Sequence, residues 1–122
     1  MSYPYRQKYG NKKVLVDGIS FDSKREANRY TELKMMVRSG EISDLELQKE
    51  YELIPSQYEK TSGQKGKPKC LERSVKYIAD FVYKDNRTGE CVVEDTKGVR
   101  TPEYIIKRKL LLYIYGIRIK EI

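Results

Sequence analysis

The chain has 122 residues, and its 25 Lys and Arg residues against 18 Asp and Glu residues give a formal net charge of +7. With an apolar class of 39%, this length supplies one small sheet with packed helices, and not two domains. The chain has no histidine, and its two cysteines form no CxxC pair, which excludes structural zinc and imidazole-based catalysis. The longest apolar run, at residues 110–117, is too short to cross a bilayer, and the first residues lack the apolar core of a signal peptide. We therefore expect a protein of the reducing cytoplasm.

The first 13 residues are predicted to form a flexible basic arm, because they hold Lys and Arg residues and no acid. Next come two short apolar segments, 14–16 and 19–21, which flank Asp17-Gly18. An Asp-Gly pair favours a tight two-residue turn, so we expect a short hairpin here.

Ser23 and Glu26 have the spacing of a capping box, which predicts a helix that ends at Gly40. Residues 45–53 alternate between apolar and polar side chains, which predicts a half-buried strand. Residues 57–69 have no apolar periodicity and are rich in Gly, Ser, Thr and Lys, so we expect a flexible loop.

Residues 71–83 and 91–97 are predicted strands, joined by a turn at 85–89 whose Asp, Asn and Gly residues are typical of turns. A second helix is predicted over 101–116, because this segment opens on Thr and Pro and closes on Gly. Residues 117–120 then form a closing strand.

The expected fold is α/β, with the order helix, three strands, helix, strand and a mixed sheet. The last helix connects two strands that we expect to be parallel. A short N-terminal hairpin precedes this core. We expect two parts, with residues 1–13 as the arm and residues 14–122 as one domain.

Asp80 lies between Ile78 and Val82 on one face of a predicted strand, where an ionised carboxylate is costly unless a cation or hydrogen-bond donors meet it. Asp95 lies in the following predicted strand. Because a short turn joins the two strands, we expect these carboxylates to lie close enough to share a divalent ion. Without histidine or a CxxC pair, that ion would be a hard one, Mg²⁺ or Mn²⁺.

Lys97 shares the strand face of Asp95, and Glu26 begins the stripe of the first helix that packs on the sheet. Two structural interpretations stay open as alternatives to a functional site. In the first, Glu26 only completes the capping box. In the second, the acids around Lys97 form a structural ion-pair network with it. A bulge that shifts the strand by one residue would also replace Asp95 by Glu94 as the ligand.

Asp80, followed across a hairpin by Asp95-Thr96-Lys97, resembles the PD-(D/E)XK signature of the restriction-endonuclease-like nucleases. The element order also matches the common core of that superfamily, over about residues 14–122. Ala79 stands where the signature's name has proline, a position that the superfamily keeps loosely. Three segments are more narrowly similar to small phage-encoded members: Phe21-Asp22-Ser23 with Glu26, Tyr77-Ile78-Ala79-Asp80-Phe81, and Glu94-Asp95-Thr96-Lys97-Gly98.

The resemblance implies that Asp80 and Asp95 ligate Mg²⁺, that Lys97 orients or activates the attacking water, and that Glu26 is the helix-borne acid. It thereby implies a metal-dependent endodeoxyribonuclease of the bacterial host's cytoplasm, structure-directed and used in phage DNA replication, recombination or packaging. A homodimeric junction resolvase is one form of such an enzyme. The alternatives are a non-catalytic DNA-binding accessory protein that keeps the fold, and an RNA-binding module.

Basic segments on either side of the acids predict contacts to the phosphates of DNA. The basic residues near the second helix lie on it or just before it. The basic residues of the predicted loop and of the arm are expected to bind phosphates without sequence specificity. No organic cofactor is implied. The predicted contacts are Arg100, Thr101 and Lys107 near the helix, Lys65, Lys67 and Lys69 in the loop, and Lys12 and Lys13 in the arm.

Overall fold

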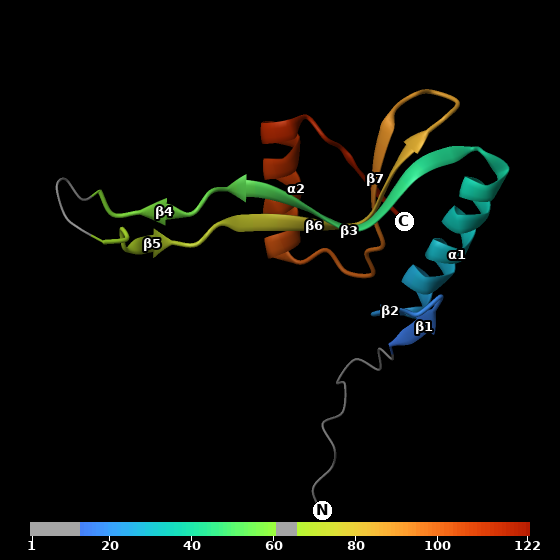
Figure 1. The fold of residues 1–122 in the computed structure, drawn as a ribbon, viewed down its shortest axis with the longest axis horizontal. Coiled ribbons are helices and arrows are strands. Elements are labelled where there is room, and N and C mark those ends of the chain that lie inside the picture. The colour runs from blue at the N-terminus through green and yellow to red at the C-terminus, as the bar shows by residue number, and fades with distance from the viewer. Residues whose placement is uncertain (1–12, 61–65) are drawn as a thin grey trace, which may run out of the picture. The chain divides into compact units, whose positions relative to one another are not determined.

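The structure is a computed structural model that describes residues 13–60 and 66–122 (Figure 1). Of the predicted basic arm, only Lys13 therefore lies within the described residues. The elements of this described part are β1 (Val14–Val16), β2 (Ile19–Phe21), α1 (Lys24–Ser39), β3 (Ile42–Ile54), β4 (Gln57–Tyr58), β5 (Cys70–Glu72), β6 (Val75–Asp85), β7 (Cys91–Asp95), α2 (Pro102–Tyr115) and β8 (Ile119–Glu121).

The fold is α/β, with two helices and a mixed four-stranded sheet in the described part of the chain, as the element order predicted. The strands of this sheet follow the order β3-β6-β7-β8. Strand β8 runs parallel to β7, with Asp95 opposite Glu121, so α2 is the expected crossover between parallel strands. This register brings Glu121 beside Asp95 at the end of β7.

Both helices end where their local sequence signals predicted. Ser23 Oγ accepts a hydrogen bond from the Glu26 backbone N–H (3.1 Å), and Gly40 closes α1 in the left-handed conformation with φ of 81°. At α2, Thr101 Oγ accepts from the Tyr104 backbone N–H (3.2 Å), and Gly116 closes the helix. The rules of helix capping act within one turn of the chain, which is why sequence alone locates these ends.

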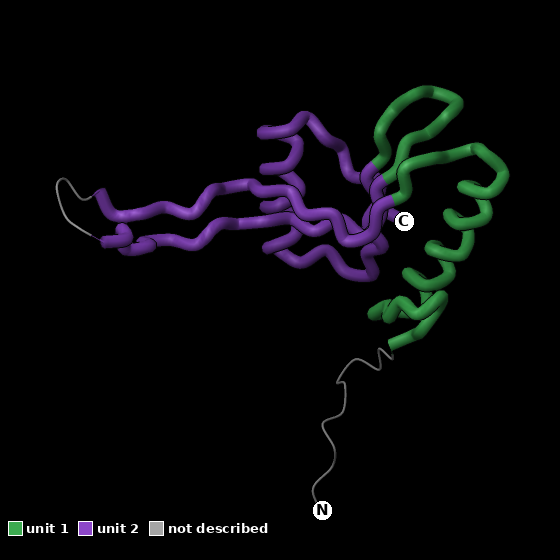
Figure 2. The backbone as a smooth tube through the Cα atoms, viewed as in Figure 1, with its two compact units in different colours: residues 1–45, 83–92 green, residues 46–82, 93–122 purple. Residues whose placement is uncertain are grey.

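The chain forms two compact units (Figure 2). The first contains the described residues up to 45 together with residues 83–92. Here α1 contacts the β1–β2 hairpin, and the ring centroids of Phe21 and Tyr30 lie 5.0 Å apart. The Tyr30 hydroxyl donates to Asp17 Oδ2 (3.1 Å), which ties the helix to the hairpin turn. Burial, followed by the hydrogen bond to Asp17, raises the pKa of Tyr30.

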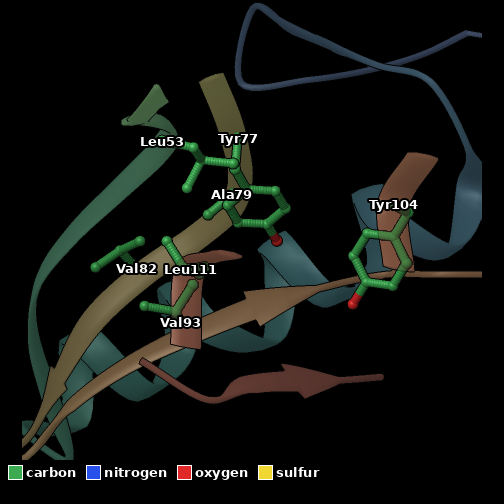
Figure 3. Packing of buried hydrophobic residues seen from close by; sticks show 7 residues of the cluster. All are labelled: Leu53, Tyr77, Ala79, Val82, Val93, Tyr104 and Leu111. Carbon is green, nitrogen blue, oxygen red and sulfur yellow. The ribbon is translucent and has the colours of Figure 1, made fainter. Parts of the chain in front are cut away.

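The second unit contains residues 46–82 and 93–122 and holds the apolar cluster shown in Figure 3. Strands β3, β6 and β7 supply one side of this cluster, and α2 supplies the other. At the end of α2, the Tyr115 hydroxyl donates to the backbone carbonyl of Glu52 in β3 (2.6 Å). The buried members of the cluster are Leu53, Tyr77, Ala79, Val82, Val93, Tyr104 and Leu111.

Several predicted boundaries need correction. The predicted strand 71–83 is broken at Ser74, whose backbone N–H donates to Ser56 Oγ (3.0 Å), so it becomes β5 and β6. The segment predicted as a loop begins with strand β4, which pairs with β5, and the two continue β3 and β6 as a narrow antiparallel ribbon (Figure 1). β7 ends at Asp95 instead of Lys97, and β8 begins at Ile119 instead of residue 117.

Within the described residues, neither helix has the length and apolar character required to cross a membrane.

The apolar cluster of the second unit yields a stability prediction. Leu111 is fully buried, whereas its neighbour Leu112 is 49% exposed. Leu111→Ala should lower the free energy of unfolding by about 2–5 kcal/mol, because it removes buried methyl groups and leaves a cavity. The matched control Leu112→Ala should change it by about 0.5 kcal/mol or less, as measured by urea denaturation. Equal losses would contradict this packing of α2.

Candidate active site

Two carboxyl groups meet inside the second unit. Asp80 lies in β6, and Asp95 is the last residue of the neighbouring β7. Asp95 is only 2% exposed, and the neighbouring Asp80 carboxyl raises its pKa. The structure thus brings together the two acids that the hairpin pattern predicted to be neighbours.

Each of the two carboxyl groups is held by other parts of the chain. Asp80 Oδ2 accepts hydrogen bonds from both the backbone N–H (2.9 Å) and the hydroxyl (2.7 Å) of Thr96. Because the Thr96 N–H is used here, the strand ladder of β7 stops at the preceding residue. Asp95 Oδ2 accepts from the hydroxyl of Tyr77 (2.5 Å), whose ring lies in the apolar cluster. The orientation of both acids is therefore fixed by the surrounding fold.

The environment of Asp95 disfavours its charge. The pKa of Asp95 is raised from 3.8 to about 6, mainly by burial and also by the neighbouring Asp80 carboxyl, while the Tyr77 hydroxyl and Lys97 oppose this rise. Burial and the hydrogen bond to Asp95 also raise the pKa of Tyr77, so its hydroxyl stays a donor. A divalent cation bound here would favour the ionised form of Asp95, since metal binding displaces protons from its ligands.

Lys97 is the cation beside this pair. Its Nζ lies 3.6 Å from Asp95 Oδ2 and 4.5 Å from the ring centroid of Tyr104. An ammonium group over an aromatic face is stabilised by the ring's electrons. The side chain of Lys97 is 30% exposed, so the ammonium group contacts solvent as well as the buried acids.

Glu121 of β8 fixes Tyr104 in turn. Its carboxylate accepts from the Tyr104 hydroxyl (2.6 Å) and from the guanidinium groups of Arg100 (2.6 and 3.0 Å) and Arg108 (3.4 Å). The Tyr104 hydroxyl and then the two guanidinium groups lower the pKa of Glu121, whereas burial raises that of Tyr104. Arg100, a predicted phosphate contact, is therefore paired with an acid of its own chain.

Glu26 lies in the first unit, where it is 7% exposed in the first turn of α1 and completes the predicted N-terminal hydrogen bond. Its role as an acid of the site remains a prediction. Glu94, the alternative ligand, is fully buried in β7, one residue before Asp95. Because successive strand residues point to opposite faces, it does not share the face of Asp95.

The other predicted phosphate contacts lie in several places. Thr101 caps α2, and the Nζ of Lys107 lies 3.0 Å from the carboxylate of Glu103. Lys13, Lys67 and Lys69 are exposed, whereas Lys12 and Lys65 lie outside the described residues.

The carboxylate oxygens of Asp80 and Asp95 suit a small hard cation better than a soft metal. Among the described residues, no group of three or more His, Cys, Asp and Glu side chains is arranged to hold a metal. Mg²⁺ is commonly bound by one or two carboxylates, with water and substrate phosphates completing its shell. Asp80 and Asp95 would hold such an ion.

Sequence reasoning missed four residues that build the site: Tyr77, Thr96, Tyr104 and Glu121. One signal pointed to the last of these. Glu121 is the only acid in the C-terminal segment 117–122, and a strand parallel to β7 brings its end to the end of β7. The other three side chains carry no such signal.

The chain belongs to a family described as proteins of unknown function, DUF1064, which it matches over residues 6–120. Neither a curated protein nor a solved structure matches the chain.

The buried carboxyl of Asp95 predicts a pH dependence. The pKa is higher in the folded state, so the unfolded state loses this proton first as pH rises. The contribution of Asp95 to stability is therefore present below about pH 4 and is lost by about pH 6. Relative to Asp95→Asn, the metal-free wild type should lose about 2–3 kcal/mol of unfolding free energy between pH 4 and pH 7. Urea denaturation in EDTA measures this difference, and a pH-independent difference would contradict the raised pKa.

Proposed function

We propose that this protein is a metal-dependent endodeoxyribonuclease of the PD-(D/E)XK type. The observation that carries the proposal is the position of Asp80, which binds Thr96 and so lies beside Asp95, with the Lys97 ammonium group 3.6 Å from Asp95. Two neighbouring carboxylates, one of them buried, oppose each other's ionisation at neutral pH. A divalent cation that binds a phosphodiester would offset that cost, which supports a metal site here.

The element order supports the more specific fold assignment. The series α1, β3, β6, β7, α2, β8 is the order of the restriction-endonuclease-like core, with the acids on β6 and β7. This order and the acid positions are independent features of the chain. Their agreement with the Asp-Thr-Lys triplet at the end of β7 is what favours this superfamily over another small α/β fold.

The residues of the chain divide the chemistry between them. Asp80 and Asp95 would hold the cation, and Thr96 and Tyr77 fix the direction of their oxygens. A divalent ion, when bound, would supply positive charge for the phosphate and lower the pKa of water. The Lys97 ammonium group stabilises the negative charge that develops on the phosphate oxygens and orients the attacking water. Tyr104 and Asp95 keep that ammonium group in place.

DNA is the proposed substrate because the unit that holds the two acids also presents Lys residues. Lys67 and Lys69 are exposed just before β5, and Lys107 is half-buried on α2. Such contacts neutralise phosphates without reading bases, which fits structure-directed cleavage. We further propose phage DNA replication, recombination or packaging in the host cytoplasm as its setting, with a homodimer as one way to cut two strands.

A direct assay tests the proposal. The purified protein is incubated with branched, single-stranded and linear duplex DNA in Mg²⁺, Mn²⁺ or EDTA. We expect cleavage of at least one substrate with metal and none with EDTA. DNA that is retarded on a gel but stays intact under every condition would instead favour the accessory DNA-binding protein.

The two neighbouring acids of β7 provide a matched pair of variants. Asp95→Asn should abolish cleavage, because it removes a ligand charge, whereas Glu94→Gln should retain most of the activity. Thermal melts establish that both variants fold. The reverse pattern would show that Glu94 is the ligand.

Lys97→Ala tests the mechanism. Single-turnover cleavage should slow by about 10²–10³-fold, since a positioned donor at the reacting phosphate typically contributes that much. Affinity for Mn²⁺ should hold or rise, because a cation beside the carboxylates is removed. Lys109→Ala removes the same charge from exposed α2 surface and should cleave normally. An unchanged rate in Lys97→Ala would remove this residue from the mechanism.

A further inference from the structure

A small hollow opens beside Lys97 in the second unit, between β6 and the start of α2. It has a volume of about 280 Å³, and we call it the lysine pocket. The side chains that define it are Lys76, Ile78, Lys97, Glu103, Tyr104 and Lys107. Typical small-molecule sites in proteins are about 300–1,000 Å³, so this hollow suits a single small group.

Three ammonium groups surround this hollow, against one carboxylate. Lys97 and Lys107 are about 30% and 27% exposed, and Lys76 is 47% exposed. Two of these lysines form ion pairs with exposed acids. Lys107 pairs with Glu103, whose side chain is 77% exposed, and Lys76 pairs with Glu50, whose side chain is 58% exposed. Ion pairs at such exposed positions contribute little, about 0.2–1 kcal/mol each. An anion with more charge could replace these partners at small cost.

The same hollow has an apolar wall. Ile78 is 48% exposed on β6 although it lies between two buried residues, Tyr77 and Ala79. The ring of Tyr104 forms another part of the lining, with Lys97 Nζ above it. A free inorganic anion has no use for apolar contacts. A nucleotide does, because the C–H groups of its sugar and the flat face of its base can pack on apolar side chains beside a charged phosphate.

We propose that the lysine pocket is a subsite for one nucleotide of the substrate strand, with the phosphate between Lys76 and Lys107 and the sugar and base against Ile78. The proposal rests on the proposed nuclease function for the identity of the strand. Lys97 lines this pocket and also lies beside the carboxyl of Asp95. The subsite therefore holds a nucleotide adjacent to the scissile phosphate, and it contributes to substrate affinity more than to the chemical step.

The test uses thymidine 5′-monophosphate, with thymidine and inorganic phosphate as comparison ligands, in titrations followed by NMR on the full chain. Thymidine 5′-monophosphate should bind at least tenfold more tightly than either comparison ligand. Lys107→Gln should weaken that binding about tenfold, because it removes one charged hydrogen bond. The matched control Lys109→Gln, from the same helix, should leave it unchanged.

A second variant separates a nucleotide from a simple anion. Ile78→Thr should weaken thymidine 5′-monophosphate several-fold while leaving inorganic phosphate binding unchanged. Equal binding of the nucleotide and inorganic phosphate would overturn the proposal, as would an equal loss in the two lysine variants. In both lysine variants and Ile78→Thr, a thermal melt confirms folding.

Cleavage assays distinguish failure of the proposed subsite from failure of the proposed nuclease function. In an active enzyme, Lys107→Gln should raise KM for DNA about tenfold with little change in kcat. Cleavage by a protein that fails to bind the nucleotide would overturn the subsite alone. Nucleotide binding that follows the predicted variant pattern, in a protein that cleaves no DNA, would overturn the nuclease and leave the subsite.

Discussion

The contact between the carboxyl groups of Asp80 and Asp95 is the constraint on which the rest of the site depends. Burial and mutual repulsion both oppose ionisation, and the pKa of Asp95 accordingly rises to about 6. One ammonium group, that of Lys97, does not balance two ionised carboxylates. The proposed divalent ion would supply the further positive charge, and carboxylate oxygens favour a hard ion.

The surrounding structure holds this unfavourable pair in place from three directions. Thr96 fixes Asp80 and ends β7, and Tyr77 reaches Asp95 from the apolar cluster. Tyr104 places a ring beside Lys97 and is itself held by Glu121 from the parallel strand β8. The crossover through α2 therefore also positions the site. It brings β8 to the end of β7, where Glu121 binds Tyr104 and Arg100.

The parts of this arrangement that depend on residues close together in the chain could be predicted from the sequence. The caps Ser23 and Thr101 act within one turn, and a short turn between two strands makes Asp80 and Asp95 neighbours. The hydroxyl of Tyr77 and the ring of Tyr104 depend on side-chain directions and helix packing, which no short pattern encodes. The same limit explains Arg100: its position suggested a phosphate contact, but its pairing with Glu121 arises only from the register of β8.

The central claim, that Asp80 and Asp95 form a cation site, is tested most directly by calorimetric titration of Mn²⁺ at pH 6 in two buffers of different protonation enthalpy. The account predicts one bound ion per chain, with release of a fraction of a proton, because Asp95 is partly protonated at that pH. Asp80→Asn should abolish this binding, whereas Asp85→Asn, at the far end of the same strand, should retain it. Mn²⁺ binding that is absent, or unchanged in Asp80→Asn, would contradict the account.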